Sequence, residues 1–144
     1  LDPIVASALY PSLRTVLEGL SERDAVNKLL QFVQTAFVYE YDDIVWGGDR
    51  AFFADETLYY PYADCEDRAV LFSRLVRDIV GLNVVLLYYP GHLAAAVEFN
   101  EEVLGDYLLY GKKKYIVCDP TYIGAPVGRT MPNMNNQEAQ IIIL

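Results

Sequence analysis

The fold is decided by residues 84–99, which read VVLLYYPGHLAAAVEF. Val84 to Tyr89 and His92 to Phe99 are short apolar runs, rich in β-branched, aromatic and small residues, and both have the length of a strand. Further strands are predicted at Asp106 to Tyr110, Lys114 to Asp119 and Ile141 to Leu144, with a tight hairpin at Gly111-Lys112-Lys113. Every predicted strand therefore lies in the second half of the chain.

The first half is predicted to be helical. Apolar residues recur at helical spacing from Ser21 to Phe37, and a shorter helix is predicted over Pro11 to Leu20. A third helix with a broad apolar face is predicted to begin at the N-cap Asp64 and to end at Gly81. Val38 to Ala63 is predicted to be a long irregular segment. Helices followed by strands favour an α+β fold over alternating βαβ units.

Composition bounds the kind of protein. The chain has 144 residues, of which 53% are hydrophobic, so residues 1–144 are predicted to form a single domain around one core. A net charge of -9 argues against a nucleic-acid partner. No apolar run approaches the roughly 20 residues that cross a bilayer, so membrane insertion is not expected. The chain begins at Leu1 rather than Met, which indicates a piece of a processed or longer protein, and no oligomeric state is indicated.

Three residues carry candidate chemistry. Cys65 falls in the first turn of the third predicted helix, His92 opens a predicted strand, and Asp119 closes another. His92 is the only histidine, so it is the only imidazole base available to a thiol. Singly, these residues fit a core thiol, a satisfied polar group and a turn. Their joint placement favours a Cys-His-Asp triad.

The other cysteine, Cys118, is predicted to lie in the core. Two cysteines and one histidine without a CxxC pair make a poor zinc site, and a metal-dependent hydrolase is disfavoured for the same reason.

The triad makes a demand on the sheet. In a simple meander, the strands that contain His92 and Asp119 would run parallel and would hold these residues at opposite ends. We therefore predict that Lys114 to Asp119 pairs antiparallel with His92 to Phe99, and that Asp106 to Tyr110 lies outside them.

A reactive thiol and an oxyanion site make further demands. A helix start and an imidazolium lower a thiol pKa, whereas the acids Asp64, Glu66 and Asp67 raise it. The predicted oxyanion donors are the backbone N–H of Cys65 and the side-chain amide of Gln34, which lies nearer the end of its helix than Gln31.

These residues resemble the transglutaminase-like superfamily of cysteine enzymes. The resemblance rests on Asp64-Cys65-Glu66-Asp67-Arg68-Ala69, Gly91-His92-Leu93-Ala94 and Val117-Cys118-Asp119-Pro120, and covers roughly Asn27 to Tyr122. With Phe37-Val38-Tyr39, Asp42 and Trp46-Gly47-Gly48-Asp49, the chain is most similar to the bacterial transglutaminase-like cysteine peptidases. Two positions depart from that pattern, because Gln34 stands where the family usually has Asn and Ala63 where it usually has Gly.

The resemblance implies a papain/transglutaminase-like core, in which a central helix carrying Cys65 packs on an antiparallel sheet. It supports Gln34 as an oxyanion donor and favours an exported protein, periplasmic or extracellular. Some relatives bind calcium beside the nucleophile, which would involve Asp64 and Glu66 here. Acids in a first helical turn are also stabilised by the helix dipole without a metal. No cofactor is therefore expected to be required, and calcium is kept as an optional ion.

Two functions remain. The first is acyl transfer on protein or peptide amides, with hydrolysis by a cysteine peptidase preferred over cross-linking or deamidation. Trp46, Tyr60 and Tyr62 are predicted to line the substrate groove, among aromatic residues of which about half would fill the core on any reading. The second is a binding or structural module without turnover, which Ala63 and the acids beside the thiol favour.

Overall fold

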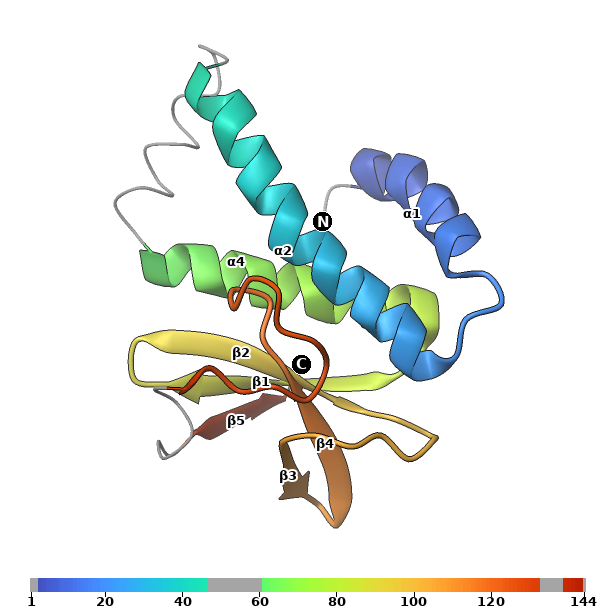
Figure 1. Cartoon of the computed structure of the whole chain (residues 1–144), viewed down its shortest axis with the longest axis vertical. Helices are drawn as coiled ribbons and strands as arrows, with labels where there is room; N and C mark the ends of the chain where they lie inside the picture. Colours follow the sequence, from blue (N-terminus) through green and yellow to red (C-terminus); the bar gives the residue numbers. More distant parts are fainter. Residues whose placement is uncertain (1–2, 47–60, 133–138, 144) are drawn as a thin grey trace.

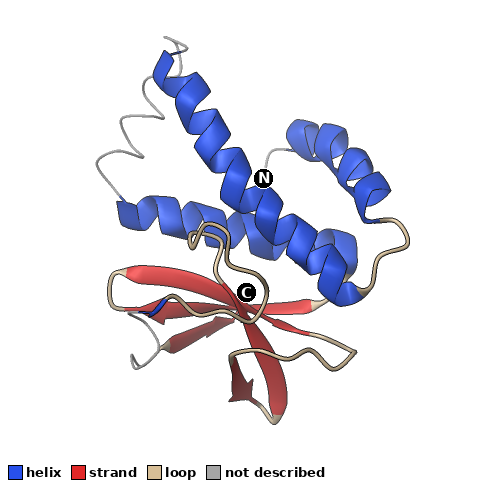
Figure 2. Cartoon of the chain, in the orientation of Figure 1, coloured by secondary structure: helices blue, strands red, loops and turns tan. Residues whose placement is uncertain are grey.

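The computed structural model of the chain describes residues 3–46, 61–132 and 139–143, with side chains at 7, 9–35, 66–132 and 139–143. Within these ranges, helices lie on one face of a five-stranded antiparallel sheet (Figures 1 and 2). Helices precede strands along the chain, so the predicted α+β class is confirmed. No helix in the described part of the chain is both long and apolar enough to cross a membrane.

The first two helices are longer than predicted. Helix α1 spans Pro3–Leu17 with Pro11 inside it, so the prediction that a helix begins at Pro11 is wrong. Helix α2 spans Glu22–Trp46, so the prediction of an irregular segment is wrong over 38–46. The physical reason is that no glycine or proline interrupts the chain between Ser21 and Gly47, and aromatic or acidic residues alone do not end a helix.

The third helix, α4, spans Pro61–Leu75 and continues into the π-helical turn η1, Val76–Val80. It begins three residues before the predicted N-cap Asp64, because proline is well tolerated in the first turn of a helix. Its predicted end is confirmed: Gly81 takes φ 80° and its N–H bonds to the carbonyl of Val76, as in a left-handed helix cap.

The sheet contains β1 (Asn83–Tyr89), β2 (His92–Glu98), β3 (Tyr107–Tyr110), β4 (Lys113–Cys118) and β5 (Gln140–Ile143). These strands agree with the predicted runs to within one residue at each end. Their order is β3-β4-β2-β1-β5, with β2 and β4 paired antiparallel and β3 outside them. The predicted order of these three strands is confirmed.

Two tight hairpins set the register of the sheet. Gly91 takes φ 75° in the two-residue turn between β1 and β2, so that Tyr89 lies opposite His92. Gly111 and Lys112 both have positive φ, 58° and 66°, in the turn between β3 and β4. Positive φ at both central residues is the signature of a type I′ turn, whose twist matches that of paired strands.

The main core lies between the helices and the sheet. Its centre is formed by side chains that are fully buried, with 0% exposure: Leu29, Leu30 and Phe72 from the helices, and Ala95 and Val97 from β2. A smaller cluster, formed by Leu87, Ala94, Val117 and their neighbours in the strands, lies on the opposite face of the sheet. Side chains alternate along each strand, so the continuous apolar runs of β1 and β2 supply both clusters.

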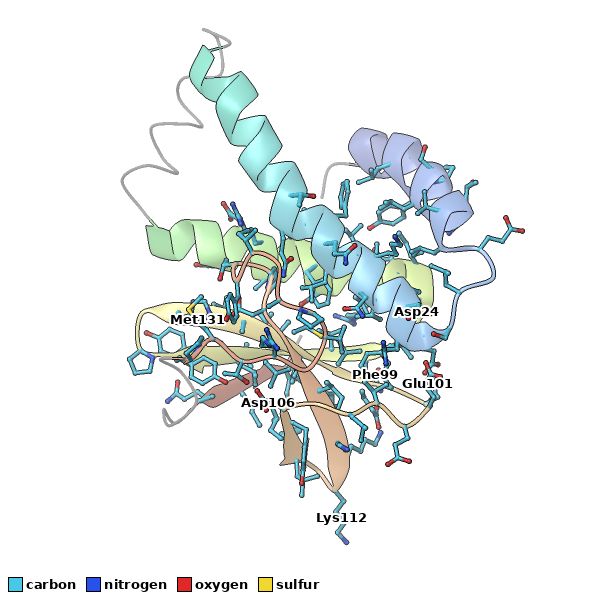
Figure 3. All side chains as sticks on the ribbon, viewed as in Figure 1. Asp24, Phe99, Glu101, Asp106, Lys112 and Met131 are labelled. Atoms are coloured by element: carbon cyan, nitrogen blue, oxygen red, sulfur yellow. The ribbon has the colours of Figure 1, made fainter. Side chains whose placement is uncertain are left out.

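The beginning of α2 is tied to the chain that follows β2. Glu22 accepts hydrogen bonds from the backbone N–H of Asn100 at 2.8 Å and of Glu101 at 3.2 Å. In the other direction, the carboxylate of Glu101 accepts the N–H of Arg23 at 2.9 Å. Figure 3 shows Asp24, Phe99 and Glu101 gathered at this junction. The contacts fix the first turn of α2 against the end of β2.

Candidate active site

The strongest feature of the site is a buried contact between His92 and Asp119. His92 Nε2 and Asp119 Oδ2 are 2.7 Å apart, and the two residues are only 5% and 2% exposed. The antiparallel pairing of β2 with β4 brings the start of one strand to the end of the other. A carboxylate can only accept, so this contact places the ring proton on Nε2. The other ring nitrogen, Nδ1, is then the one suited to accept a proton.

The second oxygen of Asp119 is also held. Oδ1 accepts the backbone N–H of Thr121 at 3.0 Å and the Thr121 hydroxyl at 2.8 Å. A side chain that bonds the N–H two residues on forms an Asx turn. The carboxylate therefore cannot rotate away from His92 without breaking these bonds. Thr121 was not among the predicted site residues, although an Asp two residues before a Thr is a signal that could have indicated it.

Tyr89 forms one wall of the site. Its ring centroid is 6.2 Å from that of His92, which lies opposite it in the β1–β2 ladder. Burial raises the pKa of Tyr89, and the charges of Asp119 and Asp106 raise it further, so its hydroxyl stays protonated. Tyr89 also lines a groove of about 520 Å³ with Leu87 and Val117, which belong to the cluster on the face opposite the helices.

Cys65 is the fifth residue of α4, and its side chain lies outside those that the structure describes. Helix α4 packs on β2, and in Figure 1 its beginning lies over the end of the sheet where β2 begins. The prediction that Cys65 lies in the first turn is wrong, because the helix begins at Pro61. Its backbone N–H thus falls after the four N–H groups that a helix start leaves without an intrahelical partner. This placement argues against that N–H as an oxyanion donor and weakens the dipole effect on the thiol.

The charged side chains that follow Cys65 differ in their exposure. Glu66 and Asp67 are exposed, so water screens their charge. Arg68, three residues after Cys65 on the same helix, is only 8% exposed.

Gln34 is buried, with 1% exposure, and its amide is bonded to the loop that follows β4. Its Nε2 lies 3.1 Å from the carbonyl oxygen of Asp119, 3.0 Å from that of Tyr122 and 3.1 Å from that of Ala125. Its Oε1 accepts the N–H of Gly124 at 3.2 Å. An amide has two N–H donors, and three carbonyls already surround them. In this arrangement the Gln34 amide fastens a loop and has no N–H to offer a reacting carbonyl, which speaks against the predicted oxyanion role.

Cys118 is in the core as predicted, with 0% exposure and no disulfide. Burial raises the pKa of its thiol, and the negative charge of Asp119 next in sequence raises it further. A neutral, enclosed thiol of this kind is a poor nucleophile, so Cys118 does not compete with Cys65 for the role.

The remaining predicted site residues lie at the border of the described chain. Trp46 ends α2 and Tyr62 is the second residue of α4, but their side chains, like that of Asp64, are outside the described set. Tyr60 lies outside the described residues altogether. Glu66 is exposed, and among the residues that the structure describes no group of three or more acidic, histidine or cysteine side chains is placed to hold a metal ion.

Comparisons of the chain with family models, with curated proteins and with solved structures found no match.

Proposed function

We propose that this chain is a cysteine-dependent acyl-transfer enzyme that acts on protein or peptide amides and chiefly hydrolyses them. The observation that carries the proposal is the contact of 2.7 Å between His92 Nε2 and Asp119 Oδ2, in which the second carboxylate oxygen is held by Thr121. A buried carboxylate that fixes one ring nitrogen of a sole histidine orients the other nitrogen as a base.

The chemistry would use three residues of this chain. Cys65 Sγ bonds to the carbonyl carbon of the substrate amide, while the thiol proton passes to His92 Nδ1. The C–N bond then breaks, and His92 returns that proton to the leaving amine. Water attacks the resulting thioester, gives a proton to His92, and releases the acid as the thiol is reformed. Asp119 stabilises the imidazolium at both stages.

The placement of α4 and the resemblance to transglutaminase-like cysteine peptidases support the same assignment. The resemblance proposes Cys65 as nucleophile and a papain/transglutaminase-like arrangement of helix and sheet, and α4 packs on β2, the strand that begins with His92.

The direct test is alkylation of the native protein with iodoacetamide between about pH 5 and 9, with the modified cysteine identified by mass spectrometry. An active site predicts that Cys65 reacts with a midpoint below the value of about 8.5 typical of an exposed thiol, and that His92→Ala slows it. Cys118 is an internal control, because its burial predicts no modification until the protein unfolds. An ordinary midpoint at Cys65 that His92→Ala leaves unchanged would rule the enzyme out.

A second candidate is a binding module that has kept the fold without turnover. The position of Cys65 one turn inside α4, together with Ala63 before Asp64, favours it. This candidate predicts an ordinary or inert Cys65 in the alkylation experiment and no hydrolysis of unstructured protein substrates. Hydrolysis that disappears in Cys65→Ala would exclude it.

A further inference from the structure

Gln34 and the loop 119–125 form a contact between two distant parts of the chain. Gln34 lies in α2, and the loop begins with Asp119 directly after β4. In Figure 1 this loop rises from the sheet to the helices, where hydrogen bonds join it to α2. No strand or helix occupies residues 119–125, so the ladder of the sheet cannot hold them in place.

The loop is shaped so that three carbonyls converge on one point. The N–H of Tyr122 bonds to the carbonyl of Asp119, and the N–H of Ala125 bonds to the carbonyl of Tyr122. These two successive turns bring the carbonyls of Asp119, Tyr122 and Ala125 to the same side, three residues apart. Gln34 Nε2 lies within 3.1 Å of all three oxygens.

The orientation of the Gln34 amide follows from these partners. Its nitrogen faces carbonyls, which can only accept, and its oxygen faces the N–H of Gly124, which can only donate. If the Gln34 amide were rotated by 180°, its oxygen would face the three carbonyl oxygens and its nitrogen would face the N–H of Gly124, so all four hydrogen bonds would be lost. The four contacts are therefore mutually consistent, and a buried amide in this setting is expected to be rigid.

We infer that Gln34 is a positioning residue for the His92–Asp119 pair: it holds the backbone of the loop so that the Asp119 carboxylate meets His92 Nε2. One of the three carbonyls that Gln34 binds belongs to Asp119, and the carboxylate of the same residue binds His92. A shift of that backbone moves the carboxylate with it. The consequence for turnover rests on the proposed function, whereas the consequence for the His92–Asp119 contact does not.

Asn27 provides a matched control. It lies on the same helix, and its Oδ1 accepts the N–H of Val127 at 2.8 Å, farther along the same chain segment. Asn27→Ala thus removes a bond between α2 and this segment without removing one from residues 119–125. Any general loosening of the contact between α2 and the segment should affect both variants, whereas loss of positioning should be specific to Gln34.

The experiment measures the ring nitrogens of His92 by NMR in ¹⁵N-labelled full chain, where the sole histidine gives one set of signals. The native protein is expected to show Nε2 protonated and bonded. Gln34→Leu should shift these signals towards a mixture of tautomers, while Asn27→Ala should leave them in place. Gln34→Asn, which keeps an amide but shortens its reach, serves as a second variant in case Gln34→Leu does not fold. Its expected signals lie between those of the native protein and those of a His92 without its partner, given by Asp119→Ala.

The rate of Cys65 alkylation gives a separate readout. A His92 that has lost its orientation no longer lowers the pKa of the Cys65 thiol, so the alkylation rate at neutral pH is expected to fall by up to about 30-fold in the Gln34 variants. Unchanged His92 signals in folded Gln34 variants, or equal changes in Gln34 and Asn27 variants, would overturn the inference. If His92 responds as expected but native Cys65 is unreactive, the positioning role stands and the proposed enzyme fails.

Discussion

Ala95 of β2 lies directly opposite Cys118 of β4, and this pairing sets the register that brings Asp119 to His92. A shift of one residue along this ladder would move Asp119 and turn every side chain of β4 to the other face of the sheet. Cys118 would then leave the core, where it has 0% exposure. Burial of Cys118 in the core therefore fixes the strand register that places Asp119 beside His92.

Asp119→Asn should abolish most of the reactivity of Cys65. The amide keeps the size of the carboxylate and one oxygen for Thr121, but it loses the charge that stabilises an imidazolium and changes the preferred ring tautomer. A thiol with an ordinary pKa of about 8.5 is still a few per cent thiolate at pH 7, so we expect the alkylation rate at neutral pH to fall by up to about 30-fold. Asp24→Asn is the control, because the Asp24 side chain is 57% exposed in the first turn of α2. Equal rates in the two variants would contradict the role of Asp119.

Thr121→Val should have a smaller effect of the same kind. The substitution removes the hydroxyl bond of 2.8 Å to Asp119 and keeps the backbone bond of 3.0 Å. A single hydrogen bond to a charged group contributes about 1.5–3 kcal/mol, and the backbone bond remains, so we expect a decrease in the alkylation rate that is measurable but smaller than that of Asp119→Asn. Thr121→Ser retains the hydroxyl and should restore most of the rate. A slow serine variant would show that the threonine methyl, not the hydroxyl, matters.

The buried thiol of Cys118 is expected to make the free energy of unfolding depend on pH in alkaline solution. Burial raises the pKa of its thiol in the folded state, so the unfolded chain loses this proton at lower pH. Its contribution to stability is complete below about pH 8.5 and decreases above that value, by about 1.4 kcal/mol for each pH unit, until the folded thiol itself ionises. Urea titrations at pH 7 to 10 should show this decrease in the native protein relative to Cys118→Ala. Parallel pH curves would mean that the thiol is not enclosed.

The carboxylate of Glu22 is expected to make the free energy of unfolding decrease in acidic solution. Burial alone would raise the pKa of its carboxyl, but hydrogen bonds from Asn100 and from the N–H of Glu101 lower it overall. The carboxylate therefore stabilises the fold above its unfolded pKa of about 4.3, and this stability is lost as the pH falls through the lower folded value. Glu22→Gln should cost about 1 kcal/mol at pH 7 after screening by solvent, and much less near pH 3. Glu102→Gln, at an exposed position beside this junction, should cost little at either pH.

Calcium binding beside the thiol can be decided by thermal melting. If Asp64 and Glu66 hold calcium, millimolar calcium should raise the melting temperature through preferential binding to the folded state. The same concentration of magnesium should do less, because magnesium gives up its water reluctantly. Asp64→Asn should remove the calcium effect. No shift in melting temperature at millimolar calcium would eliminate the ion.

Several features could be predicted because their causes are local. The strands from Val84 to Tyr89 and from His92 to Phe99 are continuous apolar runs, and a glycine marks the turn between Tyr110 and Lys114. The helix ends were harder. The end of α2 and the start of α4 differ from the predictions by nine and three residues, because acids and aromatics are compatible with a helix that packing or propensity favours.

The role of Gln34 shows what local patterns cannot reveal. The resemblance indicated an amide at this position, but the hydrogen bonds of that amide reach Asp119, Tyr122 and Ala125, which lie at least 85 residues away. No local sequence pattern around a residue in a predicted helix indicates which distant loop its side chain will contact. Thr121 is a different case, because its contact with Asp119 spans only two residues and the Asp-x-Thr spacing could have indicated it.

The sequence by itself determined the α+β class, the positions of the strands and the order Cys65, His92, Asp119 along the chain. The requirement that His92 and Asp119 meet was also sufficient to predict the order of three strands. Tertiary structure alone decided that their side chains meet at 2.7 Å and that Gln34 bonds to the loop that begins with Asp119. The reason is physical: periodicity and turn residues act over a few positions, whereas buried polar groups select their partners only after the helices and the sheet have packed.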